Sequence, residues 1–104
     1  MTTKPVALGP ERLRTIARRL DAGPSIARRS AGPFGTFAAY LPGERIEGVR
    51  VVADNHLEIH VVMRWAATVD DVERDVIAAV DDQTVAVDVI VDDIDLATQK
   101  TRKR

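Results

Sequence analysis

The segment from Leu57 to Trp65 limits the fold of this chain more than any other. Its apolar residues fall on every second position: Leu57, Ile59, Val61, Met63 and Trp65. Because the side chains of a β-strand alternate between the two faces of a sheet, this pattern predicts a strand with one buried and one solvated face. The chain must therefore cover one face of a sheet and leave the other largely polar.

Shorter apolar segments on either side predict the rest of the sheet. Residues 49–53 form a short strand, and Asp54–Asn55 suits a tight hairpin turn, because both residue types tolerate positive φ. A helix over 68–80 has Thr68 as its N-cap, and its apolar stripe consists of Val69, Val72, Val76, Ile77 and Val80. A third strand begins at Val85, and a right-handed crossover through the helix makes it parallel to the second strand.

The amino-terminal half adds one clear helix, which begins at Pro10. Four of its apolar residues share one face: Leu13, Ile16, Ala17 and Leu20. The expected fold is a small single α+β domain in the order α–β–β–α–β, with a three-stranded mixed sheet and both helices packed on one of its faces. We expect a flexible arm over 1–9, the domain over 10–97 and a basic disordered tail over 98–104, whereas residues 25–47 have no readable pattern.

The last strand changes phase along its length. Its apolar residues first fall on odd positions, from Val85 to Val91, and then on even positions, at Ile94 and Leu96. A strand with one core face keeps a period of two, so an extra residue or the end of pairing must intervene. We expect a bulge or the end of the paired strand at Asp92–Asp93.

Three apolar residues fall on the polar side of the predicted sheet, one in each strand: Val52, Val62 and Ile90. If the strand over 49–53 lies between the other two, these residues meet in one patch rimmed by charge. Such a patch is typical of an interaction surface, here for self-association or partner docking. The alternative is that residues 34–41 fold back and cover the patch within the chain, through Phe34, Phe37 and Tyr40.

The only histidines are His56 and His60, and with Glu58 they lie on one strand face, near Asp88 and Asp92. Zn²⁺ accepts imidazole and carboxylate ligands, but residues four apart in a strand are separated by about 13 Å. The two histidines therefore cannot share one ion, and we expect a solvated polar face without a metal. No nucleophile with a base and an orienting group is recognisable, so we expect no catalytic residues, no enzymatic activity and no cofactor.

The "GPFG" of Gly32–Gly35 matches the G-x-x-G loop of KH-type nucleic-acid-binding domains, and Arg28 and Arg29 precede it. In those domains the loop clamps the nucleic-acid backbone between two helices. A KH-like nucleic-acid-binding domain, with contacts from Arg28, Arg29, Gly32 and Gly35, is therefore the alternative function. The acidic second half of the chain argues against nucleic acid as the partner.

Charge is unevenly distributed along the chain. Residues 1–50 contain nine basic and four acidic residues, residues 51–99 contain two basic and twelve acidic residues, and residues 100–104 contain four basic residues. Such a split supports self-association or contact with an anionic surface. The chain has no cysteine, no signal-peptide pattern and no apolar run of about 20 residues, so we expect a cytoplasmic protein.

Four segments together resemble the alkaline shock protein family of bacterial envelope stress-response proteins: Gly48–Val51, Leu57–Trp65, Thr68–Val80 and Val85–Ile94. They match its "GV-V" strand, its alternating aliphatic strand, its helix with an acidic opening and its final "V-V-V–D-I" strand, over residues 38–96 of a chain that is short for the family. The segment "RRSAGPFGTF" departs from the Gly/Val-rich loop often found there.

The resemblance implies a non-enzymatic cytoplasmic protein without cofactor or small-molecule substrate. Family members are linked to envelope stress, some self-assemble, and they can be held at the membrane by an integral membrane partner. The expected function is therefore a structural or interaction module in cell-envelope homeostasis or stress response. It would act as a homo-oligomer, by docking to a membrane-anchored protein at the inner face of the membrane, or both.

Overall fold

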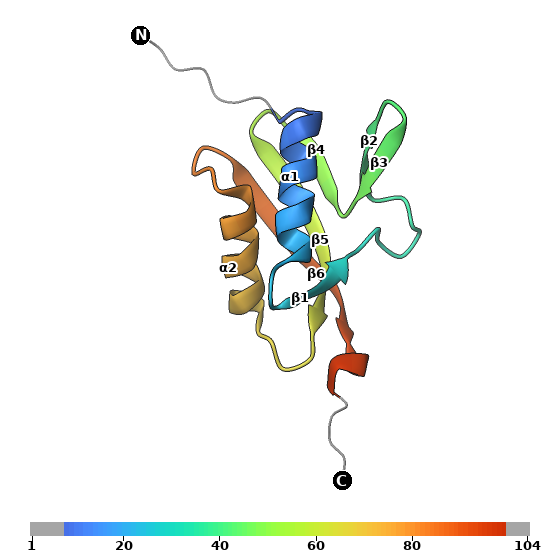
Figure 1. The fold of residues 1–104 in the computed structure, drawn as a ribbon, viewed down its shortest axis with the longest axis vertical. Helices are drawn as coiled ribbons and strands as arrows, with labels where there is room; N and C mark the ends of the chain where they lie inside the picture. Colours follow the sequence, from blue (N-terminus) through green and yellow to red (C-terminus); the bar gives the residue numbers. More distant parts are fainter. Residues whose placement is uncertain (1–7, 100–104) are drawn as a thin grey trace.

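The computed structural model describes residues 8–99, which form two α-helices, six strands and one short 3-10 helix (Figure 1). In chain order the elements are α1 (Pro10–Asp21), β1 (Ile26–Arg29), β2 (Ala38–Leu41), β3 (Glu44–Glu47), β4 (Val49–Ala53), β5 (His56–Arg64), α2 (Val69–Val80), β6 (Ala86–Asp95) and η1 (Leu96–Gln99). The α+β class is confirmed. The expected three-stranded sheet is wrong, because the larger sheet has four strands and β2 and β3 form a second sheet.

β5 is the centre of the larger sheet. β6 pairs with it in parallel along one edge, as the crossover predicts. β4 and β1 share its other edge, both antiparallel, with Val49 opposite Ile59 and Ile26 opposite Met63. The expectation that residues 49–53 could lie between the other two strands is therefore wrong. β1 escapes prediction because its four residues, "IARR", are too few and too charged to show alternation.

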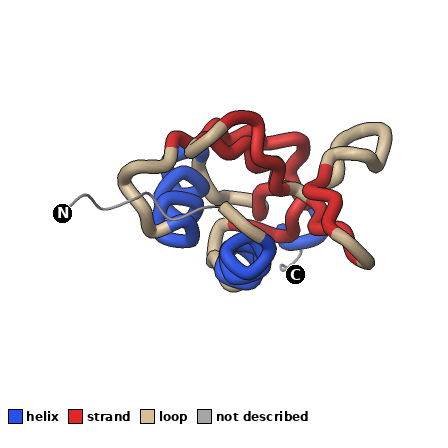
Figure 2. The backbone as a smooth tube through the Cα atoms, turned by 90° about the horizontal axis from the view of Figure 1, so that it is seen from above, coloured by secondary structure: helices blue, strands red, loops and turns tan. Residues whose placement is uncertain are grey.

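The main core lies between the sheet and the two helices, which cover the same face of β5 (Figure 2). Leu57, Ile59, Val61 and Met63 of β5 are buried there, as their alternation predicts. Trp65 was expected to point the same way but is 47% exposed, because β5 ends at Arg64 and the chain turns through Ala66, which has a φ of 73°. Neither helix within residues 8–99 has the length and apolarity that crossing a membrane requires.

Both helices begin and end where local chemistry dictates. Pro10 is the first residue of α1, where its missing N–H costs nothing. Thr68 caps α2 as predicted, because its side chain accepts a hydrogen bond from Asp71 N while the Asp71 carboxylate accepts one from Thr68 N. Asp81 closes α2 in the left-handed conformation, with a φ of 52°.

The hairpin of β2 and β3 projects from the domain on the side away from α2 (Figure 1). Its base contributes Ala39 and Ile46 to the core. Gly48 then joins β3 to β4 with a φ of 81°, and a Cβ there would stand 2.8 Å from Arg29 Cβ and 2.9 Å from His60 O. Only glycine fits where the chain turns so closely past β1 and β5.

A bulge in β6 explains the phase change of the last strand. Val61 pairs with Val91, but the next residue of β5, Val62, pairs with Asp93, so Asp92 is the extra residue. After the bulge Ile94 lies opposite Met63 and returns to the helix side of the sheet. The predicted bulge at Asp92–Asp93 is confirmed.

The domain boundaries differ slightly from those expected. Leu8 packs against the core and Gly9 caps α1, so these two residues belong to the domain and not to an arm. At the other end η1 extends to Gln99, beyond the expected boundary at residue 97. The remaining parts of the predicted arm and tail, 1–7 and 100–104, lie outside the described residues.

Candidate functional site

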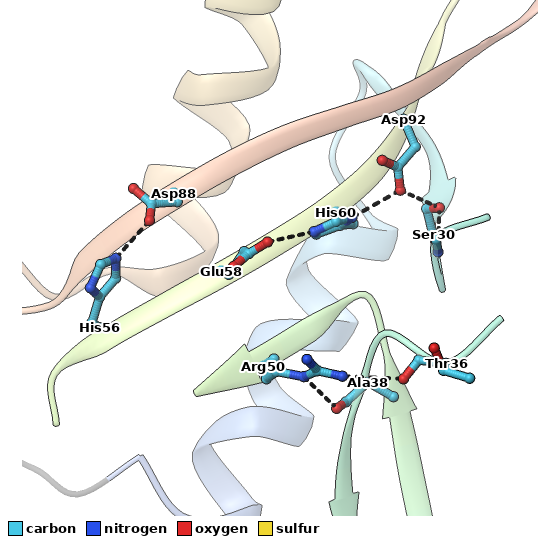
Figure 3. A network of polar contacts seen from close by, with 10 residues as sticks. Ser30, Thr36, Ala38, Arg50, His56, Glu58, His60, Asp88 and Asp92 are labelled. Carbon is cyan, nitrogen blue, oxygen red and sulfur yellow. Dashed lines mark hydrogen bonds and ion pairs between the residues drawn. The ribbon is translucent and has the colours of Figure 1, made fainter. Parts of the chain in front are cut away.

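The polar face of β5 carries a chain of side-chain contacts that starts at Glu58 (Figure 3). Glu58 Oε2 lies 2.8 Å from His60 Nε2, and His60 Nδ1 lies 2.9 Å from Asp92 Oδ2. The Ser30 hydroxyl donates to the same Asp92 oxygen at 2.7 Å. His56 stands apart from this chain and contacts Asp88 Oδ2 at 2.8 Å, so the two histidines occupy separate positions, as their spacing requires.

An aromatic ring covers His60. Phe37 stacks on the imidazole with ring centroids 3.7 Å apart, and the Arg50 guanidinium lies 4.6 Å from the centre of the Phe37 ring. Arg50 also donates to the backbone oxygens of Thr36 and Ala38 (Figure 3). Residues 34–41 therefore do fold back over the polar face, but through Phe37, while Phe34 and Tyr40 remain exposed.

The order of these groups is not that of a hydrolytic triad. Histidine must lie between the hydroxyl and the carboxylate to take a proton from a nucleophile, whereas here Asp92 lies between Ser30 and His60. Both ring nitrogens of His60 contact carboxylates, Nε2 that of Glu58 and Nδ1 that of Asp92. Within residues 8–99 no group of three or more potential ligands is placed to hold a metal ion. The cluster instead ties β5, β6 and the loop after β1 together.

The Gly32–Gly35 loop is a turn between strands. Gly35 N donates to Gly32 O at 3.1 Å, and both glycines have positive φ. The loop connects β1 to β2, so it lacks the two flanking helices on which the KH comparison depends. Arg28 is exposed, but Arg29 is held by Asp21 at 2.8 Å and by Glu47 O at 2.9 Å.

The structure does not bring Val52, Val62 and Ile90 together. Val52 is exposed at the far end of β4, near the start of β5, whereas Val62 is only 4% exposed near the other end of β5. Ile90 is half-buried and pairs with His60 in the parallel register. Val52 lies beside the first two residues of β5, five to six residues before Val62, so about 15–20 Å of β5 separates these two side chains and the three residues do not form one surface.

A different apolar surface follows the line where α2 lies beside β6, and we call it the α2–β6 seam. One hollow at its end is lined by Ile77, Val85 and Val87, with Asp81 and Asp82 at the rim. A second hollow, of about 520 Å³, is lined by Met63, Val69, Val91, Ile94 and Leu96, and by Asp92 and Asp93 of the bulge. Ile77 is 67% exposed and Val69 is 53% exposed. The seam is thus an apolar strip with aspartates at both ends.

The periodicity of α2 predicted Val69 and Ile77 as part of its buried stripe, and this is wrong. The residues of α2 that are buried are Val72, Val76, Ala79 and Val80. Val69 is the first residue of α2 and lies two turns before buried Val76 on the same side of the helix, so its exposure reflects its place at the helix end. Ile77 follows Val76 and lies at the edge of the buried face. In the sequence this appears only as an apolar stripe that extends past the buried residues, to the first residue of α2 and to Ile77.

The acidic rim of the seam is fixed by local hydrogen bonds. The Thr84 hydroxyl donates to Asp82 Oδ1 at 2.6 Å, and Thr84 N donates to the same oxygen at 2.9 Å. These bonds, and then the nearby Arg12 guanidinium, lower the pKa of Asp82 below its ordinary value. Asp82 therefore remains anionic at neutral pH, and the Arg12 guanidinium beside it offsets part of its charge.

A second exposed apolar surface lies on the hairpin side of the molecule, and we call it the aromatic arm. It consists of Phe34, which is 86% exposed, and Tyr40, which is 61% exposed. Tyr40 is held in place because its hydroxyl donates to Thr36 O at 2.8 Å. The arm and the α2–β6 seam lie on different sides of the domain (Figure 1).

Comparison with known proteins gives no match, whether to protein-family models, to curated proteins or to solved structures.

Proposed function

We propose that this protein is a non-enzymatic interaction module of bacterial cell-envelope homeostasis or stress response, which self-associates and docks to a membrane-anchored partner from the cytoplasmic side. The observation that carries the proposal is the pair of exposed apolar surfaces, the α2–β6 seam and the aromatic arm, on different sides of one small domain. A protein that both assembles and docks needs two such surfaces. The link to the cell envelope comes from the sequence resemblance over residues 38–96.

The α2–β6 seam is the proposed docking surface. Exposed apolar strips with a charged rim are typical of contact sites, because burial of the strip against a partner removes apolar area from water. Val69 and Ile77 are fully formed parts of a capped helix, so docking needs no rearrangement of α2. The side chains of Val69 and Ile77 lose little conformational entropy on binding, because β-branched side chains in a helix already favour one rotamer.

The aromatic arm is the proposed self-association surface. Aromatic side chains are enriched at protein interfaces, where a rigid ring covers a large area for few restricted rotamers. Phe34 lies in a turn and Tyr40 in a strand, so both rings are presented by ordered backbone. Arg45 lies beside the arm, where it donates to Gly35 O at 3.0 Å and pairs with Glu47 at 2.7 Å. The acidic second half of another copy would complement the basic first half of this chain.

Two matched variants test the proposal. Ile77→Asp and Phe34→Asp each place one charge at an exposed apolar position, and neither side chain belongs to the core. In the cell of origin, Ile77→Asp should leave the membrane fraction while the unchanged protein stays in it. In light scattering of purified protein, Phe34→Asp should reduce the mean mass and Ile77→Asp should not. Both variants behaving like the parent in both assays would contradict the proposed function.

A further inference from the structure

β6 is an edge strand. It pairs with β5 along one side, and within residues 8–99 its other side has no strand partner. An edge of this kind presents a row of backbone N–H and C=O groups that another extended chain can pair with. At ten residues β6 is the longest strand of the domain, so it offers the longest template.

The two faces of β6 have opposite character, as the register against β5 shows. Val87, Val89, Val91 and Ile94 lie opposite core residues of β5 and so face the helices. Asp88, Asp93 and Asp95 lie opposite Glu58, Val62 and Arg64, on the polar face of the sheet. β6 contains four aspartates and no lysine or arginine.

A strand added at this edge would continue both faces. On the helix side its residues would enter the α2–β6 seam. There they would occupy the two hollows and contact the exposed side chains of Val69 and Ile77. On the polar side they would stand beside Asp88 and Asp93, and opposite charges on neighbouring strands stabilise the pair. The fitting segment therefore alternates apolar with basic residues.

A second copy of β6 fits this edge poorly. In an antiparallel pair centred on Ile90, Asp88 of one copy lies opposite Asp92 of the other, and like charges directly opposite are destabilising. The bulge at Asp92 further disturbs a regular ladder between two copies. These features select against self-pairing while leaving the edge open to a basic strand.

We infer that the β6 edge binds an extended segment of another polypeptide as an added strand, with apolar side chains in the α2–β6 seam and basic side chains along Asp88 and Asp93. This inference rests on the proposed docking role of the seam and names the chemistry of its partner: a segment of alternating apolar and basic residues.

Three short synthetic peptides serve as probes for the full chain. The first alternates lysine and valine, and the second alternates glutamate and valine. The third has the same composition as the first, but all its lysines stand at one end. The first should bind at least about tenfold more tightly than either of the others. In NMR hydrogen exchange it should protect the β6 amides that face away from β5. Asp93→Lys, which changes an exposed side chain, should weaken the preference for the lysine peptide over the glutamate peptide.

Several results would overturn the inference. These are no binding, equal binding of the alternating and grouped lysine peptides, or protection confined to α1 or the hairpin. Protection of β6 that rises with protein concentration and without peptide would show that a second copy is the occupant. If Asp93→Lys fails to fold, by circular dichroism, the peptide comparison on the parent decides alone. If the peptides fail but Ile77→Asp still leaves the membrane fraction, strand addition is wrong and docking by the seam stands.

Discussion

Asp92 is the extra residue of the β6 bulge, and its carboxylate lies 2.9 Å from His60 Nδ1 in the neighbouring strand. The irregularity that moves Ile94 to the helix side therefore also places Asp92 between His60 and Ser30. One local feature of the backbone thus sets both the apolar lining of the α2–β6 seam and the centre of the polar cluster.

Removing the Asp92 carboxylate should lower the stability of the fold more than removing a neighbouring exposed carboxylate. Asp92→Ala leaves His60 Nδ1 and the Ser30 hydroxyl without their acceptor in a partly covered site, so we expect a loss of about 1–3 kcal/mol in the free energy of unfolding. Asp93→Ala is the matched control, because its side chain is exposed and accepts from Ile94 N, its own neighbour. It should cost less than about 0.5 kcal/mol in urea titrations at neutral pH. Equal losses would contradict the role given to the cluster.

Gly48 should tolerate no side chain. Gly48→Ala combines a φ of 81° with a Cβ 2.8 Å from Arg29 Cβ and 2.9 Å from His60 O, so β1, β4 or β5 must shift. Gly43→Ala has a similar φ of 78° but meets nothing within 4 Å. We expect Gly43→Ala to cost about 1 kcal/mol, from backbone strain alone, and Gly48→Ala to cost clearly more. Thermal melts of the two variants side by side would show the difference, and similar melting temperatures would contradict the close approach.

The cap of α2 should make stability depend on pH in the acidic range. Hydrogen bonds to Asp71, first from Thr68 N and then from the Thr68 hydroxyl, and next from Arg74, lower the pKa of its carboxyl below 3.8. A carboxyl whose pKa is lower in the folded state stabilises the protein above its unfolded pKa, and this stabilisation is lost as pH falls through the folded pKa. Asp71→Asn should therefore be less stable than the parent at neutral pH and should approach it in strong acid. A difference in the free energy of unfolding between parent and variant that stays constant with pH would contradict this account.

The sequence predicts those parts of the fold in which one short window contains the whole pattern. The alternation of Leu57–Met63, the cap at Thr68 and the phase change after Val91 each identify their element correctly. β1 and the β2–β3 hairpin escape prediction because their strands are four residues long and their pairing partners lie elsewhere in the chain.

The candidate surface could not be predicted for a related reason. Val69 and Ile77 have the spacing of buried helix residues, but Val69 lies at the helix end and Ile77 at the edge of the buried face, so both are exposed. The expected patch of Val52, Val62 and Ile90 depended on the order of the strands, which no local pattern encodes. The hydrogen bonds of His60 likewise depend on a bulge and a loop that meet only in three dimensions.

Photocrosslinking from position 77 in living cells tests the docking role of the α2–β6 seam most directly. A photoreactive phenylalanine analogue replaces Ile77 in one strain and Arg18, an exposed residue of α1, in another. We predict a discrete adduct from position 77 that fractionates with membranes and is not formed from position 18. No adduct from position 77, or the same adduct from both positions, would contradict docking by the seam.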